Sequence, residues 1–153
     1  MKFALMAAAL VSVALPKATL SEPSLKTAHN PPELVDSTQY GYSQAVSVPA
    51  SARTIYVAGQ VGQTVEGPND FESQVDRSFA NLMVALKAAG GAPENIVRIT
   101  LLIKDYDPEK LAYIGKKRRE VFGDSPPASV LIPVTRLYID EVNFEISAVA
   151  VTR

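Results

Sequence analysis

Two hydrophobic periods alternate along most of the chain. Apolar residues recur at every second position in several short stretches, which is the period of β-strands, and at spacings of three and four in two longer stretches, which is the period of α-helices. The clearest strand is 96–104, where all odd-numbered positions from 97 to 103 are apolar. The predicted order is strand 42–48, strand 54–61, helix 71–89, strand 96–104, helix 108–122, strand 129–135 and strand 142–151.

Residues that commonly cap helices stand at the ends of both helical stretches. Asp70 can accept backbone hydrogen bonds before the first, and Gly90 and Gly91 end it. Pro108 fits the first turn of the second helix, where no backbone N–H is needed, and Gly123 follows its last turn. The core-facing apolar positions are Phe71, Val75, Phe79, Leu82 and Leu86 in the first helix and Leu111, Ile114, Val121 and Phe122 in the second.

This order predicts an α+β fold, with two helices on one face of a mixed β-sheet. Strict alternation in strand 54–61 puts Ile55, Val57 and Val61 on one face and Tyr56, Ala58 and Gln60 on the other. Two helices cover only one face of such a sheet, and the opposite face is only partly polar. We therefore expect a symmetric homo-oligomer to cover part of it.

The first forty residues differ from the rest of the chain. Residues 1–18 have one positive charge at Lys2, then an apolar run and small residues, which is the pattern of a secretory signal peptide. The run is too short to span a bilayer. Residues 19–40 contain three prolines and no sustained period, so we expect an extended lead-in to a domain at 41–153. A cleaved signal implies a periplasmic or secreted protein with no membrane span, and a mis-assigned start implies a cytoplasmic one.

Composition excludes several classes of chemistry. The chain has no cysteine, which rules out disulfides and thiolate catalysis, and its one histidine, His29, lies in the proline-rich lead-in. We therefore expect neither a metal site nor a cofactor. The net charge of −1 gives no overall attraction to nucleic acid. The dense basic run 116–119 is read as a solvated helix face, since no aromatic stacking platform accompanies it.

The last strand carries the best candidate for acid–base chemistry. A period of two places Phe144, Ile146, Ala148 and Ala150 under the helices and turns Asn143, Glu145 and Ser147 to the opposite face. A carboxylate at a partly covered interface is unfavourable unless it is hydrogen-bonded, and such groups often perform proton transfer. Glu145 is therefore the candidate general acid/base. Alternatively, this face of the strand is exposed to solvent, or Glu145 forms an ion pair with Arg98 or Arg136.

Several short motifs occur in a fixed order along the domain. They are Gly41-Tyr42-Ser43-Gln44-Ala45, Ile55-Tyr56-Val57-Ala58-Gly59-Gln60, Asn81-Leu82 with Ala88-Ala89-Gly90, Ile96-Val97-Arg98 with Lys104-Asp105, Pro127-Ala128 and Phe144-Glu145-Ile146. The ordered set resembles the RidA/YjgF family, whose members include proteins labelled endoribonuclease L-PSP. The resemblance runs from about Tyr42 to Val151, nearly the whole domain.

The resemblance implies a chorismate-mutase-like subunit and a homotrimer with three small-molecule clefts between neighbouring subunits. It also implies hydrolysis of small enamines and imines. By motif position the cleft residues are Tyr42 as one wall, Gly59 as a backbone contact that orients the ligand, position 129 as the carboxylate anchor, and Glu145 with a water for proton transfer.

Two positions depart from the pattern that the resemblance implies. The family usually has arginine where this chain has Ser129, and active members often have a polar residue near Gly115. A serine cannot form the bidentate contact with a carboxylate, so binding of 2-imino acids should weaken by about 10- to 100-fold. This leaves three hypotheses. The first is binding of a small, uncharged or differently charged metabolite, with hydrolysis of an imine or enamine through Glu145 without the usual carboxylate anchor. The second is a non-catalytic metabolite-binding or protective protein on the same scaffold, and the third, least favoured, is a ribonuclease.

Overall fold

The computed structural model describes residues 25–153, so the expected signal peptide at 1–18 lies outside the described residues. In order, the elements are β1 (Thr27–His29), the 3-10 turn η1 (Thr38–Tyr40), β2 (Ala45–Ser47), β3 (Arg53–Val61), α1 (Phe71–Ala88), the 3-10 turn η2 (Pro93–Asn95), β4 (Ile96–Lys104), α2 (Pro108–Phe122), β5 (Ala128–Val134) and β6 (Phe144–Thr152). Among these described elements, no helix is long and apolar enough to cross a bilayer.

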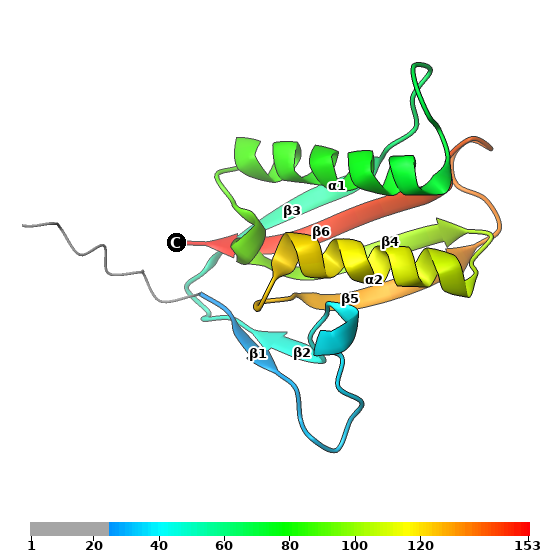
Figure 1. Ribbon diagram of the computed structural model, residues 1–153. Helices are drawn as coiled ribbons and strands as arrows, with labels where there is room; N and C mark the ends of the chain where they lie inside the picture. The colour runs from blue at the N-terminus through cyan, green and yellow to red at the C-terminus, as the bar shows by residue number, and fades with distance from the viewer. Residues whose placement is uncertain (1–24) are drawn as a thin grey trace, which may run out of the picture.

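Four of the strands form one mixed sheet in the order β3-β6-β4-β5. β6 runs antiparallel to both of its neighbours, whereas β4 and β5 are parallel and are connected through α2. Both long helices lie on the same face of this sheet (Figure 1). The prediction of an α+β fold with two helices on one face of a mixed sheet is confirmed.

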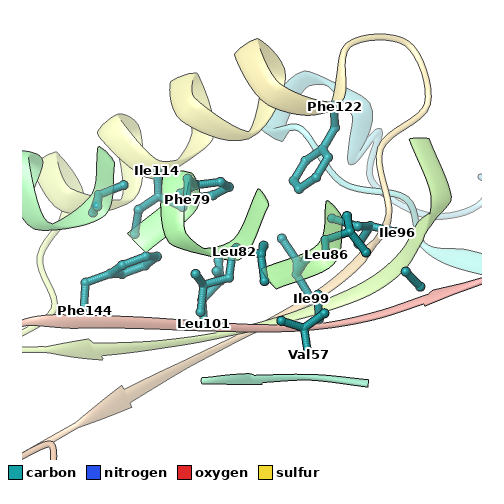
Figure 2. Packing of buried hydrophobic residues seen from close by; sticks show 14 of the residues in the cluster. Val57, Phe79, Leu82, Leu86, Ile96, Ile99, Leu101, Ile114, Phe122 and Phe144 are labelled. Atoms are coloured by element: carbon teal, nitrogen blue, oxygen red, sulfur yellow. The ribbon is translucent and has the colours of Figure 1, made fainter. Parts of the chain in front are cut away.

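The core lies between the sheet and the two helices. Ile99, Leu101 and Ile103 of β4 and the even-numbered residues of β6 point into it, as the alternation predicts. At the start of β4 the prediction is wrong, because a register shift in the pairing with β6 puts Ile96 instead of Val97 in the core. Phe144 of β6 stacks on Phe79 of α1 with ring centroids 6.2 Å apart and an interplanar angle of 11°. Phe122 of α2 packs against the same ring, so the three elements meet at Phe79 (Figure 2). Glu145, one residue after Phe144, therefore points away from the helices.

A buried amide positions the start of β6. The side chain of Gln74 in α1 is fully buried, and its nitrogen donates hydrogen bonds to the carbonyls of Asn69 at 3.0 Å and Glu141 at 2.8 Å. Its oxygen accepts from the backbone N–H of Asn143 at 2.9 Å. All three partners precede an element, α1 or β6. The hydrogen bonds of Gln74 therefore hold the start of β6, just before Glu145, against the start of α1.

A β-bulge in β3 reverses the faces of its last residues. The pairing with β6 passes from Val57 to Gln60 on β3 while β6 advances by two residues, so β3 contains one extra residue. Such a bulge shifts the alternation by one position. Val61 is paired with Glu145 and shares its face. The prediction that Val61 shares a face with Ile55 and Val57 is wrong, because strict alternation cannot anticipate a bulge.

The segment before β3 runs along the free edge of β5. Ser43 forms a parallel bridge with Ala128; its backbone N–H donates to the carbonyl of Pro127 at 2.9 Å and its hydroxyl to that of Pro126 at 2.7 Å. Further on, β2 pairs antiparallel with β1, which lies within the expected lead-in. The predicted strand 42–48 is thus shorter than expected, because its first residues follow β5 instead of pairing with β1.

The face of the sheet opposite the helices is open and partly apolar. Tyr56 of β3 is 81% exposed, and Val130 and Ile132 of β5 are 39% and 42% exposed. Tyr56 stands between the buried Ile55 and Val57, and Val130 stands between the half-buried Ser129 and Leu131. Large apolar side chains in this arrangement are typical of a surface that another molecule covers. Glu145 lies on the same face.

Candidate functional site

A cavity of about 690 Å³ opens between α2, the segment around η1 and the edge strand β5. Its walls carry three tyrosines, two leucines and two arginines, and no acidic residue. The lining residues are Gln39, Tyr40, Tyr42, Tyr106, Pro108, Leu111, Ala112, Gly115, Arg118, Arg119, Ser129 and Leu131. The cavity is therefore mainly apolar and aromatic, with positive charge only.

Three of the predicted site residues meet in this cavity. Tyr42 follows η1, Gly115 lies in the middle of α2, and Ser129 is the second residue of β5. The register with β4 pairs Ser129 with the buried Ile99, which places its side chain on the helix face of the sheet. At Gly115 a methyl group would lie 3.5 Å from the Arg119 guanidinium and 3.9 Å from the carbonyl oxygen of Tyr40. The missing side chain there widens the cavity.

Arg118 is a site residue that the sequence pattern did not identify. Its side chain is only 3% exposed, and its Nη1 donates a hydrogen bond of 3.1 Å to the hydroxyl of Ser129. Its guanidinium lies 5.3 Å from the centre of the Tyr42 ring, within range of a cation–π contact. An arginine from α2 thus reaches the place where the resemblance leads us to expect one from β5.

The interpretation of run 116–119 as a solvated helix face is therefore wrong for Arg118. Helical spacing contains the signal, because Arg118 is four residues from both Ile114 and Phe122, which belong to the buried stripe of α2. Lys117 pairs with Asp76 of α1 at 3.0 Å, so only part of the run faces solvent without a partner. The prediction treated the run 116–119 as one charged block and so did not separate the buried Arg118 from the more exposed residues beside it.

Gly59 and Glu145 form a second group on the opposite face of the sheet. A Cβ atom at position 59 would overlap the carboxylate of Glu145, so the two residues are in direct contact. Within residues 25–153, Glu145 makes no ion pair. The alternative that it pairs with Arg98 or Arg136 is wrong, since Arg136 pairs with Asp140 at 2.9 Å and Arg98 makes no ion pair in this range.

The predicted site residues therefore fall into two groups on one chain. Tyr42, Gly115 and Ser129 lie on the helix side of the sheet, at its β5 edge, and Gly59 and Glu145 lie on its other side, at the β3–β6 pair. A four-stranded sheet separates a binding cavity from the candidate acid/base. Nor does the described part of the chain hold any group of three or more side chains suited to a metal ion.

Comparison with known proteins identifies the family. The family model described as Endoribonuclease L-PSP matches residues 35–152, which is most of the chain. A RutC family protein of Pyrococcus abyssi is 35% identical over 115 residues, covering 71% of this chain and 84% of that protein. The chain belongs to the RidA/YjgF family.

Other RidA/YjgF relatives support the same assignment. The 2-iminobutanoate/2-iminopropanoate deaminase of mouse is 33% identical over 114 residues, covering 72% of this chain and 80% of that protein. A solved structure of a Rid family protein of unknown function from Yersinia pestis has a TM-score of 0.77 and 32% identity, covering 84% of this chain and 99% of that one. The YjgF gene product of Escherichia coli has a TM-score of 0.57 and 30% identity, covering 73% and 88%.

Proposed function

We propose that this RidA/YjgF chain forms a homotrimer that hydrolyses the C=N bond of a small enamine or imine. In this assembly the cavity of one subunit is closed by the Gly59–Glu145 face of its neighbour. The observation that carries the proposal is the separation of the two groups by the sheet, because neither group alone contains both a binding cavity and a proton-transfer residue. The name of the similar mouse protein supports the reaction class.

The shape of the subunit supports a closed ring. The cavity opens at the β5 edge, whereas Glu145 lies on the open face of the sheet. In the proposed contact, the β5 edge of one copy meets the open sheet face of the next, so the two copies use different surface patches. Such heterologous contacts form a closed ring when the rotation from one copy to the next is a whole fraction of a full turn. The exposed Tyr56 and Ile132 on the open face provide apolar surface for this contact.

Glu145 has the chemistry that the reaction requires. An enamine first tautomerises to the imine, gaining a proton on carbon and losing one from nitrogen. Water then adds to the imine carbon, the nitrogen is protonated, and the C–N bond breaks to give a carbonyl compound and ammonia. A carboxylate can take the proton from the attacking water and return it to the leaving nitrogen. Glu145 carries no ion pair within residues 25–153 that would compete for this role.

A comparison of wild type with Glu145→Gln tests the proposal. Imines are generated from amino acids by an amino-acid oxidase, and their loss is followed by trapping with semicarbazide. We expect wild type to accelerate hydrolysis and Glu145→Gln to lose most of that acceleration, about 100-fold or more. Glu141→Gln, a nearby exposed carboxylate, is the matched control. Absence of acceleration by wild type across a broad panel of imines would overturn the enzymatic part.

The second candidate is a non-catalytic metabolite-binding protein. The observation that favours it is that residues of one chain line the cavity and Glu145 is not among them. Ligand binding that is unchanged in Glu145→Gln, together with no hydrolysis by wild type, would support this alternative. A ribonuclease is less favoured, because Arg118 is buried and Lys117 is paired with Asp76, which leaves few free charges to contact phosphates.

We also propose that the protein is exported, to the periplasm or outside the cell. The support is the charge at Lys2 followed by an apolar run within residues 1–18. Cell fractionation with an antibody, combined with N-terminal sequencing of the mature protein, tests this proposal. A mature protein that retains Met1 in the cytoplasm would contradict it.

A further inference from the structure

We infer that Arg118 is the anchor for a carboxylate, and that the ligand of this cavity is a monocarboxylate with a bulky apolar or aromatic body. The inference deepens the proposed function by naming its substrate class, and it rests on that function only for the reaction that follows binding. It reverses the expectation that a chain with Ser129 binds an uncharged or differently charged ligand. The guanidinium comes from α2 instead of β5.

The first observation is a buried cation without an anion. Arg118 is 3% exposed, and within residues 25–153 it makes no ion pair. None of the residues that line the cavity is acidic. Burial lowers the pKa of Arg118 to about 10, so the side chain stays charged at neutral pH. Buried charges in proteins are normally paired with an opposite charge. A bound anion would supply the partner that Arg118 does not have among the described residues.

The second observation is an unsatisfied nitrogen. The Nε of Arg118 is buried and has no hydrogen-bond partner in the described part of the chain. Its Nη1 is already used by the hydroxyl of Ser129. The remaining edge of the guanidinium, made by Nε and Nη2, is the edge that takes a carboxylate through two parallel hydrogen bonds. Ser129 therefore orients the arginine, and its Nε–Nη2 edge has no hydrogen-bond partner within residues 25–153.

The backbone holds Arg118 in this position. Gly41 adopts a left-handed conformation with φ of 73°, and a Cβ atom there would come within 2.8 Å of the Cβ of Arg118. The turn after η1 can thus lie directly against α2 at this point. Tyr42, the next residue, places its ring beside the guanidinium. The arginine is therefore fixed from two sides, which favours a specific anchor over a mobile surface charge.

The rest of the cavity indicates the body of the ligand. Tyr40, Tyr42, Tyr106, Leu111 and Leu131 line it, and its volume of about 690 Å³ is far larger than a three-carbon acid needs. An aryl or branched aliphatic group on the ligand would fill this space and contact its apolar walls. Arg119 does not compete for the carboxylate, since its Nη1 donates to the carbonyl of Gln39 at 2.6 Å.

Binding of phenylpyruvate to the full-length protein, measured by isothermal titration calorimetry, tests the inference. Phenylpyruvate carries the carboxylate and the aryl group but no C=N bond, so its binding does not depend on hydrolysis. We expect wild type to bind phenylpyruvate more tightly than pyruvate, and at least 10-fold more tightly than the methyl ester of phenylpyruvate. Glu141→Gln, at an exposed position outside the cavity, should bind phenylpyruvate as wild type does.

Substitutions of the arginine provide the second arm. Arg118→Met keeps most of the side-chain volume and should weaken binding of phenylpyruvate by about 10- to 100-fold. Arg118→Lys keeps the positive charge but cannot form two parallel hydrogen bonds to a carboxylate. Its affinity for phenylpyruvate should lie between those of wild type and Arg118→Met. Lys116→Met, on the exposed face of the same helix, is the control and should bind as wild type does. Thermal unfolding of each variant separates loss of binding from loss of fold.

Three results would overturn the inference. They are no binding of phenylpyruvate by wild type, equal binding of the acid and its methyl ester, and full binding by a folded Arg118→Met variant. The comparison of acid and ester uses only wild type, so it remains decisive if Arg118→Met does not fold. Binding that follows Arg118 without any hydrolysis of imines would overturn the proposed reaction and leave the anchor standing.

Discussion

Gly59 of β3 lies directly against the carboxylate of Glu145 on β6, and a Cβ atom at position 59 would occupy the space of that carboxylate. The contact occurs beside the β-bulge, where β3 has one extra residue. Bulges commonly re-aim side chains next to functional sites. The missing side chain at 59 thus determines where the carboxylate of Glu145 lies.

Replacement of Gly59 by alanine should displace Glu145. If Glu145 is the acid/base of the proposed hydrolysis, a shift of about 1 Å is expected to lower the rate on the order of 100-fold. The rate of imine hydrolysis, measured beside thermal unfolding, tests this. Thr54→Ala, at an exposed position of the same strand, is the control and should keep its activity. Full activity of Gly59→Ala would show that the position of Glu145 does not matter.

A charge on the open face of the sheet should prevent association. Ile132 is 42% exposed on this face, and a glutamate there would be buried without a partner if copies associate through it. We expect Ile132→Glu to be monomeric where wild type is trimeric, as measured by size-exclusion chromatography with light scattering. Val84 of α1 is 70% exposed, and Val84→Glu should leave the oligomer intact. A trimeric Ile132→Glu would place the interface elsewhere.

Loss of the buried amide of Gln74 should destabilise the fold. Leucine at this position has a similar size but leaves the N–H of Asn143 and the carbonyl of Glu141 without the partners they have now. We expect the free energy of unfolding in urea to fall by about 2–4 kcal/mol. Lys87→Leu, an exposed position near the end of the same helix, should change it by less than about 0.5 kcal/mol. Equal effects of the two changes would refute this role of Gln74.

Lys26 should make stability depend on pH in the alkaline range. Its side chain is 7% exposed, and its ammonium donates hydrogen bonds of 2.7 Å to the carbonyls of Ile96 and Ser125. Burial lowers its pKa from 10.5 to about 8, although nearby Glu94 opposes the change. Between these two pH values the unfolded state binds more protons than the folded state, so stability rises with pH.

The contribution of Lys26 is thus complete above pH 10.5 and is lost as the pH falls through about 8. A matched variant, Lys26→Met, lacks this titration. We expect the free energy of unfolding of wild type relative to Lys26→Met to increase by on the order of 2 kcal/mol from pH 7.5 to pH 10.5. Urea denaturation of both proteins across this range measures it. A difference that stays constant with pH would contradict the prediction.

Local patterns were sufficient to predict the elements of the fold. Strand Ile96–Lys104 has the limits that its alternation predicts, and α1 begins directly after Asp70, whose carboxylate accepts from the backbone N–H of Ser73 at 2.9 Å. Gly90 follows the end of α1 with φ of 82°. Each of these features depends on neighbours within a few residues, which is why the sequence alone predicts them.

Features that depend on distant residues were not predictable in the same way. The bulge in β3 depends on its pairing with β6, so the reversal of Val61 could not be read from alternation. The burial of Arg118 depends on the close approach of the turn at Gly41, far away in sequence. The candidate site was therefore predicted as single residues, whereas their division into two groups required the sheet.

The division of the candidate site between the two faces of one sheet has a genetic consequence. In the proposed ring, each cleft takes its cavity from one copy and its carboxylate from the next. A copy with a damaged cavity and a copy with a damaged carboxylate, each inactive alone, would build one intact cleft when they assemble together. Two defective alleles of this gene could thus restore each other in the same cell, although neither encodes a working protein.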